Sequence, residues 1–258
     1  MKHVLLIIAF LTVSFGLAAQ SAAQRADSAY NKEDYRLAIS LYIEDLATHG
    51  PDAQVYYNLG NAYYRNGNMG RAVLSYERSL RLDPTDADAR HNLEFVRSRI
   101  QDRPEDDTSF LATLHHNILG SMTANAWAWT ALVLFVLFLG AAALYIFSSG
   151  VMLRKAGFFG GIILLFVFGY ALYVALDSAA IARSHNYAVV TAPSTMLSSS
   201  PRPSRTSTDR VVSIHEGTTV EIVDSVATPD DPVSPMWYNV KVNNATRAWL
   251  RASDVERI

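Results

Sequence analysis

The sequence predicts a multidomain membrane protein with an N-terminal all-α helical array, two transmembrane helices and a C-terminal all-β barrel. Three observations lead to this fold class. Two long apolar runs without charge lie in the middle of the chain, a repeated helical pattern precedes them, and short β-rich segments separated by turn residues follow them. The apolar runs are considered first, because they decide on which side of a membrane the other two parts lie.

The two apolar runs span residues 127–147 and 156–176, and each holds 21 residues without Asp, Glu, Lys or Arg. A helix of this length is about 30 Å long, which matches the hydrocarbon core of a bilayer. Neither run has the polar stripe of a core helix in a soluble protein. Gly157 and Gly161 share one face, at the depth of residues 140–143. We expect close helix packing there, although glycine is also simply common in membrane helices.

The charges around the runs predict the topology of a two-pass hairpin across residues 127–176. The short connection 148–155 carries Arg154 and Lys155, whereas residues 110–153 contain no Lys or Arg. Because positive loops stay in the cytoplasm, we expect this loop to be cytoplasmic. The N- and C-terminal domains would then both lie on the periplasmic side of the inner (cytoplasmic) membrane.

Residues 1–19 have the pattern of a signal peptide. Lys2 supplies a positive start, the apolar run Val4–Leu17 is too short for a comfortable membrane span, and small residues follow it. We expect cleavage before Gln20 or after Ala23, and the alternative is an uncleaved anchor. Export of the N-terminus agrees with the topology predicted from the hairpin.

Residues 20–101 carry an internal helical repeat. Tyr56-x2-Leu59-Gly60-x2-Tyr63, followed by Ala72-x3-Tyr76 and Pro84, has the 34-residue spacing of the tetratricopeptide repeat (TPR), with Tyr in place of the usual Trp. Residues 53–86 resemble that family well and residues 22–52 more weakly. One helix, about 86–100, follows as a cap. Since such arrays usually need three repeats, we expect this one to lean on a partner, the membrane or another copy.

Residues 102–126 join the array to the first apolar run. Their first part, with Pro104, Glu105, Asp106 and Asp107, is predicted to be a solvated acidic linker. Residues 110–122 place apolar side chains near helical spacing and are predicted to form a short segment at the membrane interface.

Residues 186–258 change to short segments rich in Val, Ile and aromatic residues, between clusters of Gly, Pro, Asn and Ser. Asn243-Asn244 predicts a tight turn between the last two strands. Polar loops are expected at 198–209 and 228–235. The predicted strands are 187–191, 218–223, 237–242 and 247–250.

Short motifs in this segment resemble a bacterial SH3-type barrel, over nearly all of residues 186–258. They are His215-Glu216-Gly217-Thr218, Trp237-Tyr238-Asn239-Val240, Ala248-Trp249-Leu250 and Ser253-Asp254-Val255. Ala248 stands where that family often has glycine.

The candidate binding site lies in the helical array. Asn58, Asn61 and Arg65 recur on one face of a helix, and Asn92 repeats Asn58 one period later. In TPR proteins such positions line a groove that holds a partner's backbone or carboxylate. Asparagine lowers helix propensity, so its repetition has a cause. The alternative is that these asparagines hydrogen-bond between helices and only fix their packing.

The sequence contains no recognisable catalytic set, and we expect no cofactor and no metal. There are no cysteines, and the net charge of −2 favours no nucleic acid partner. His215-Glu216 lacks the second histidine of a zinc-protease helix, so we expect a loop before a strand. His115-His116 are expected to be interfacial polar residues rather than metal ligands, because adjacent residues point to different faces of a helix. Asp177 is expected to end the second membrane helix in water.

The order of the modules, together with Asp86-Ala-Asp-Ala-Arg-His-Asn-Leu-Glu-Phe-Val-Arg-Ser-Arg-Ile100, resembles the BatE family of the Bacteroidetes aerotolerance operon. This resemblance covers the full chain. It implies a non-enzymatic envelope scaffold linked to oxygen tolerance or envelope stress, with membrane proteins bearing von Willebrand factor A domains as partners. The alternative function is a peptidoglycan-binding module anchored in the membrane, because SH3-type domains bind cell wall in some proteins.

Overall fold

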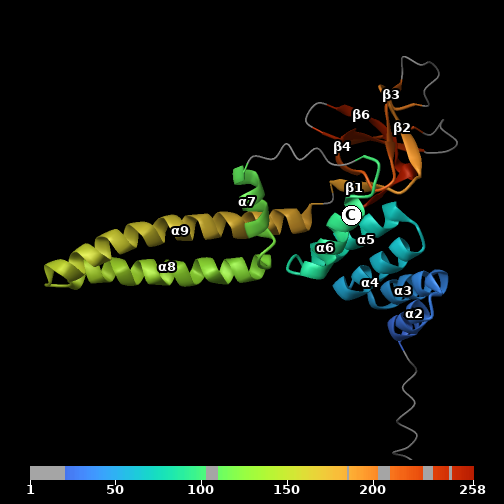
Figure 1. The fold of residues 1–258 in the computed structure, drawn as a ribbon. Coiled ribbons are helices and arrows are strands. Elements are labelled where there is room, and N and C mark those ends of the chain that lie inside the picture. The colour runs from blue at the N-terminus through green and yellow to red at the C-terminus, as the bar shows by residue number, and fades with distance from the viewer. Residues whose placement is uncertain (1–20, 103–109, 185, 203–209, 229–234, 244–245) are drawn as a thin grey trace, which may run out of the picture.

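The computed structural model describes residues 21–102, 110–184, 186–202, 210–228, 235–243 and 246–258. Five short helices form an array, two long helices run side by side as a hairpin, and strands β1 to β7 form one sheet (Figure 1). The array and the sheet lie together at one end of the hairpin, and its turn lies at the other. The predicted signal peptide, most of the acidic part of the linker and Asn244 of the predicted turn lie outside the described residues.

Each helix of the array begins where the sequence supplies a capping side chain. Ser21, Asp34, Asp52, Asn68 and Asp86 each accept a hydrogen bond from a backbone N–H of the following first turn. The helices are α2 Ala22–Asn31, α3 Tyr35–His49, α4 Ala53–Arg65, α5 Met69–Leu82 and α6 Ala87–Arg97. The last helix ends three residues before the expected residue 100, and residues 98–100 continue as a turn and a bend.

Small residues lie where the two helices of a repeat cross, as the repeat pattern predicts. A Cβ atom on Gly60 of α4 would lie only 2.7 Å from Cε1 of Tyr76 on α5. Ala72, one turn before Tyr76, is completely buried. Tyr42 and Tyr76 are the largest fully buried side chains of the described residues, so they form the centre of the array's core.

The hairpin consists of α8 Ala124–Phe147 and α9 Val151–Arg183. Both are long and apolar enough to cross a membrane, and only 6% and 22% of their most apolar windows are buried. A core helix of a soluble protein would be mostly buried. Both helices extend beyond the predicted spans. Thr123 caps α8, and only residues 148–150 separate the helices, so Arg154 and Lys155 lie at the start of α9 rather than in a loop.

Gly157 allows the closest approach within the hairpin. A Cβ atom there would lie 2.7 Å from the carbonyl oxygen of Ala141 and equally close to the backbone nitrogen of Tyr145. Gly161 is buried at the same interface, whereas Gly140 and Gly160 have open space around them. The predicted small-residue packing is therefore present, and Gly157 carries most of it.

The C-terminal strands form one curled antiparallel sheet in the order β3-β2-β6-β5-β4-β1-β7. Its edges are β3 and β7, so the strand pairing gives a half-barrel rather than a closed barrel. The SH3-type identity stays a prediction. Three strands, β2, β3 and β7, were not expected from the sequence. The strands are β1 Tyr187–Val190, β2 Ser194–Ser198, β3 Arg210–His215, β4 Thr219–Ala227, β5 Met236–Lys241, β6 Arg247–Arg251 and β7 Val255–Arg257.

Strand β1 is buried on both faces because it lies between the sheet and the array. Ala188 and Val190 enter the core of the sheet, whereas Val189 packs into the core of the array, with Ile258 beside it. The amide N–H of Gly70 on α5 donates to the Glu216 carboxylate at 3.0 Å. We expected the array to lean on a partner, the membrane or another copy. In the structure the chain's own C-terminal sheet covers α5.

Arginines connect this junction to the hairpin. Arg81 on α5 donates to the carbonyl of Ile258 and, at 3.4 Å, to the carbonyl of Ile181 near the end of α9. Arg90 on α6 donates to the carbonyl of Gly120, just before α8, at 2.9 Å. Array, sheet and hairpin therefore meet at one point of the molecule (Figure 1).

Candidate functional site

The candidate site is the face formed by the first helix of each repeat, α2, α4 and α6, which we call the first-helix face. Its first polar cluster joins α2, α3 and α4. The hydroxyl of Tyr42 donates to the Asp27 carboxylate at 2.6 Å, and the Asn58 amide donates to the same oxygen at 3.3 Å. Gln54 in turn donates to the Asn58 carbonyl at 3.1 Å.

A second polar cluster joins α4, α5 and α6 in the same manner. The hydroxyl of Tyr76 donates to the side-chain carbonyl of Asn61 at 2.7 Å, and the Asn92 amide donates to that oxygen at 2.9 Å. Asn92 also lies 3.4 Å from the hydroxyl of Tyr57. The Asn61 carbonyl therefore accepts two hydrogen bonds, as its two lone pairs allow.

The two clusters are copies of each other, one repeat apart. Residues 27 and 61, 42 and 76, and 58 and 92 are each separated by 34 positions, the period of the tetratricopeptide repeat. In each copy a buried tyrosine holds an acceptor on the first helix, and an asparagine of the next repeat shares it. The asparagine pattern of the sequence is thus explained by a hydrogen bond between successive repeats.

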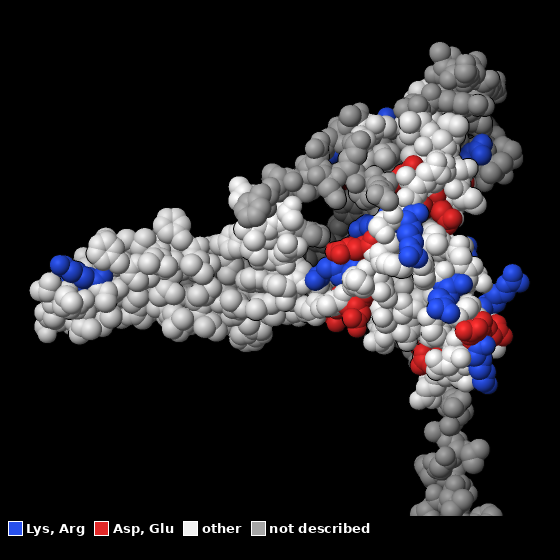
Figure 2. Space-filling model, viewed as in Figure 1, with Lys and Arg blue, Asp and Glu red and all other residues white. Residues whose placement is uncertain are grey.

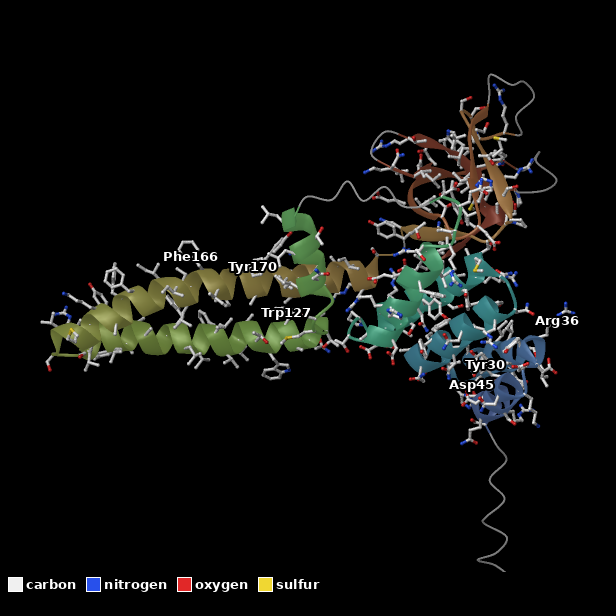
Figure 3. All side chains as sticks on the ribbon, in the orientation of Figure 1. Tyr30, Arg36, Asp45, Trp127, Phe166 and Tyr170 are labelled. Carbon is white, nitrogen blue, oxygen red and sulfur yellow. The ribbon has the colours of Figure 1, made fainter. Side chains whose placement is uncertain are left out.

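Arg65 lies beside these clusters and is about half exposed. It donates two hydrogen bonds to the hydroxyl of Tyr35, at 2.7 and 3.1 Å, and its guanidinium lies 5.3 Å from the centre of that ring. Glu33 is 3.9 Å away and largely exposed. Tyr30, which lies at the α2 end of the array (Figure 3), packs edge-on against Tyr35. The guanidinium is therefore held by the hydroxyl and the ring of Tyr35, and the nearby carboxylate of Glu33 is exposed.

Burial raises the pKa of Tyr42 and of Tyr76 well above the ordinary tyrosine value. For Tyr42 the hydrogen bond to Asp27 and the charge of that carboxylate raise the pKa further. Both hydroxyls therefore remain protonated donors at any physiological pH. The clusters are fixed hydrogen-bonding frames, not acid–base groups.

The structure therefore places the four predicted site residues on one face but gives them different surroundings. Asn61 and Asn92 contact each other, Asn58 lies in the other cluster, and Arg65 contacts the aromatic residues. The asparagines bond between helices, as the packing alternative expects. Yet Asn61 Nδ2 and Asn92 Oδ1 have no partner in the part of the chain that the structure describes. Binding of a partner by these residues stays a prediction.

A polar contact that was not predicted from the sequence joins the end of the array to the sheet. The Asp102 carboxylate accepts hydrogen bonds from the backbone N–H of His215 at 2.6 Å and from the Thr218 hydroxyl at 3.0 Å, with the His215 ring at 3.1 Å. His215 ends β3, and Glu216 lies in the following turn. The predicted loop before a strand is thus present, but it docks on the array.

Lowering the pH should weaken this contact. Partial burial would raise the pKa of Asp102, but the hydrogen bonds from His215 and Thr218 outweigh it and hold this pKa below its ordinary value. A carboxyl with a lowered folded-state pKa stabilises the fold above its unfolded value of about 3.9, and loses that contribution as the pH falls through the folded value. Asp102→Asn should therefore destabilise the chain at pH 7, and this difference should shrink as the pH falls below about 3.9 toward the folded value.

The measurement is the melting temperature of the full chain in detergent, wild type against Asp102→Asn, across this pH range. The comparison removes the contribution of other carboxyls that titrate in the same range. A difference between the two proteins that grows as the pH falls would contradict the role of Asp102.

Another polar cluster lies where α7 Phe110–Leu119 crosses α9. The His115 ring lies 3.1 Å from the Asp177 carboxylate and 3.3 Å from the hydroxyl of Tyr170, and it stacks on Tyr173. We expected Asp177 to end the helix in water. Instead α9 continues to Arg183, and Asp177 pairs with His115. The side chain of His116 lies outside the described residues, and within them no group of three His, Asp or Glu side chains could hold a metal ion.

Comparison with known proteins agrees with the geometry of the array. The tetratricopeptide repeat family model matches residues 23–87. This is about a quarter of the chain, and it covers both copies of the hydrogen-bonded cluster except Asn92. No curated protein matches the chain. Tetratricopeptide repeats are protein-interaction modules, so the first-helix face is the surface to consider for protein binding.

Proposed function

We propose that this protein is a non-enzymatic scaffold, anchored in a membrane, whose first-helix face holds an extended segment of a partner protein. The observation that supports it is the pair Asn61 and Asn92. Their mutual hydrogen bond leaves Asn61 Nδ2 as a donor and Asn92 Oδ1 as an acceptor. An extended peptide offers the matching carbonyl and N–H groups.

Arg65 adds a charge to this recognition. A guanidinium binds a carboxylate with two parallel hydrogen bonds. Its hydrogen bonds to Tyr35 hold the side chain in place, so a partner's carboxylate meets a guanidinium that is already positioned. The neighbouring Glu33 is exposed and distant enough to be displaced at little cost.

The membrane setting of this scaffold is also part of the proposal. The two long apolar helices support a two-pass protein, and Arg154 and Lys155 at their turn support a cytoplasmic turn. The array and the sheet then both lie in the periplasm. The BatE resemblance supports a role in aerotolerance or envelope stress, with proteins bearing von Willebrand factor A domains as the partners.

Arg65→Ala should weaken partner binding by about tenfold to a hundredfold, because it removes a charge-assisted pair of hydrogen bonds worth roughly 1.5–3 kcal/mol. The measurement is quantitative crosslinking in native membranes, followed by mass spectrometry of the protein captured by the wild-type chain. Arg36→Ala is the matched control, because Arg36 carries the same charge on α3 and points away from the array into solvent (Figure 3).

Asn92→Ala serves as a second variant that separates binding from packing. It removes the hydrogen bond to Asn61, so its circular dichroism must be compared with that of Arg65→Ala. Equal capture by the wild type and Arg65→Ala would refute the first-helix face as the binding surface. Capture lost in Asn92→Ala together with its helicity would assign the asparagines to packing alone. Retention of the wild type on purified peptidoglycan would instead support the cell-wall function.

A further inference from the structure

The turn of the hairpin carries two cations, and no carboxylate of the described residues lies near them. Arg154 and Lys155 lie near the start of α9, and residues 108–176 contain no Asp or Glu. Asp177 is 23 positions from Arg154 along the same helix, which is about 35 Å. That distance is several times the screening length of about 8 Å at physiological salt. In Figure 2 a blue patch lies at the far tip of the hairpin, and the visible surface of the hairpin is otherwise white until it reaches the array.

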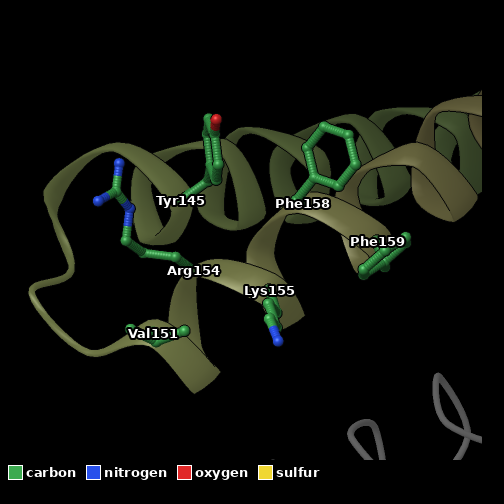
Figure 4. Close-up of a pocket in the computed structure, with 6 residues that line it drawn as sticks. All are labelled: Tyr145, Val151, Arg154, Lys155, Phe158 and Phe159. Atoms are coloured by element: carbon green, nitrogen blue, oxygen red, sulfur yellow. The ribbon is translucent and has the colours of Figure 1, made fainter.

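The side chains around these cations form an open pocket of about 400 Å³ (Figure 4). Tyr145 comes from the end of α8, and the other residues come from the first turns of α9. The guanidinium of Arg154 lies 5.7 Å from the centre of the Tyr145 ring, and that ring packs against Phe158. The lining residues are Tyr145, Val151, Arg154, Lys155, Phe158 and Phe159.

This pocket combines three features that suit an anionic group with an apolar tail. A guanidinium placed over an aromatic ring keeps its N–H edges free for the oxygens of a phosphate. The N-cap of α9 is Gly150, which provides no side-chain cap, so the first N–H groups of the helix add positive potential. Phe158 and Phe159 form apolar, exposed walls of the pocket. Such walls make favourable contacts with an apolar tail but not with a phosphate alone.

We propose that the tip of the hairpin binds the phosphate headgroup of an anionic phospholipid of the surrounding membrane. Arg154 and Lys155 contact the phosphate oxygens, and the aromatic side chains contact the glycerol and the first acyl carbons. The inference rests on insertion of α8 and α9 as proposed above. It adds a ligand at the end of the molecule opposite to the first-helix face.

The test is the lipid content of the full chain in nanodiscs of phosphatidylcholine with a minor fraction of phosphatidylglycerol. Native mass spectrometry gives the enrichment of phosphatidylglycerol among the lipids that stay bound. Arg154→Gln with Lys155→Gln should reduce this enrichment roughly thirtyfold, as expected for the loss of two interfacial charges. The exchanged pair Arg154→Lys with Lys155→Arg keeps the charge and should keep most of the enrichment, and Arg36→Gln should change nothing.

Two further arms separate the sources of the phosphate. Phe158→Ala with Phe159→Ala should lower the enrichment of phosphatidylglycerol, and added inorganic phosphate should not displace the lipid. Displacement by inorganic phosphate, with no effect of the phenylalanine changes, would show a free-anion site and overturn the proposal. Equal enrichment in the wild type and the double glutamine variant would also overturn it.

The membrane topology is measured on the same protein, so that failure of the lipid site can be distinguished from failure of the proposed topology. The chain has no cysteine, so Gly150→Cys introduces a single thiol at the turn. Labelling of this thiol only from the cytoplasmic side, without lipid enrichment, would refute the lipid site and leave the scaffold intact. Labelling from the outside would refute the proposed topology itself.

Discussion

Replacing Tyr76 with alanine should destabilise the helical array by about 3–5 kcal/mol. The ring is 1% exposed, it lies against Gly60, and its hydroxyl holds the Asn61 carbonyl. Removing it opens a cavity between α4 and α5 and leaves a half-buried acceptor with one partner fewer. Small domains have only about 5–15 kcal/mol of stability in total, so this loss removes much of the margin.

The measurement is thermal unfolding of the full chain by circular dichroism, with hydrogen exchange over residues 53–82 to locate the change. Tyr76→Phe is the matched control, since it keeps the ring and loses only a hydrogen bond worth about 1 kcal/mol. A melting temperature of Tyr76→Ala equal to that of Tyr76→Phe would show that the ring does not support the core.

Replacing Gly70 with valine should separate the sheet from the array. A Cβ atom at Gly70 would lie 2.7 Å from the carbonyl oxygen of Val190, and backbone atoms cannot turn aside as a side chain can. The contact between Gly70 and Glu216 would break, and Val189 would lose its cover. Exposing a buried valine costs about 1.5–3 kcal/mol. The array should therefore melt at a lower temperature, although its own residues are otherwise unchanged.

Hydrogen exchange of residues 187–190 and 255–258 should rise sharply in this variant, because these amides would open independently of the array. Ala87→Val is the matched control, since it places the same side chain in the exposed first turn of α6. Unchanged hydrogen exchange in Gly70→Val would mean that the contact between array and sheet tolerates the larger side chain, and this would contradict the prediction. A comparable rise in Ala87→Val would attribute the effect to the helix and not to the junction.

The sequence pattern was sufficient to predict those helices that depend on residues close to one another in the chain. Uncharged runs such as 127–147 must form helices in a membrane, because only a helix satisfies its own backbone there. The spacing of Gly60, Ala72 and Tyr76 predicted the crossing of two helices, and the structure confirms it. Strands β2 and β3 were missed, because the stability of a short strand depends on its pairing with neighbouring strands, which one segment of sequence does not show.

The candidate site was predicted by position but not by role. The 34-residue period placed Asn58, Asn61, Arg65 and Asn92 on one face. It could not show that Asn61 and Asn92 share a hydrogen bond, because that depends on the distance between successive repeats. The same limit applies to Asp102, whose partners His215 and Thr218 are more than a hundred residues away.

The sequence by itself determined the three parts of this protein, the helix starts at their capping residues, and the isolated positive charge at the tip of the hairpin. These features depend on residues within one or two turns of each other. Only the tertiary structure decided that the C-terminal sheet covers α5 and that both faces of β1 are buried. The physical reason is that the burial of a residue depends on the second surface that packs against it, and that surface can come from a distant part of the chain. Val189 is an ordinary apolar strand residue on the outward face of the sheet. It is buried only because the array packs against that face.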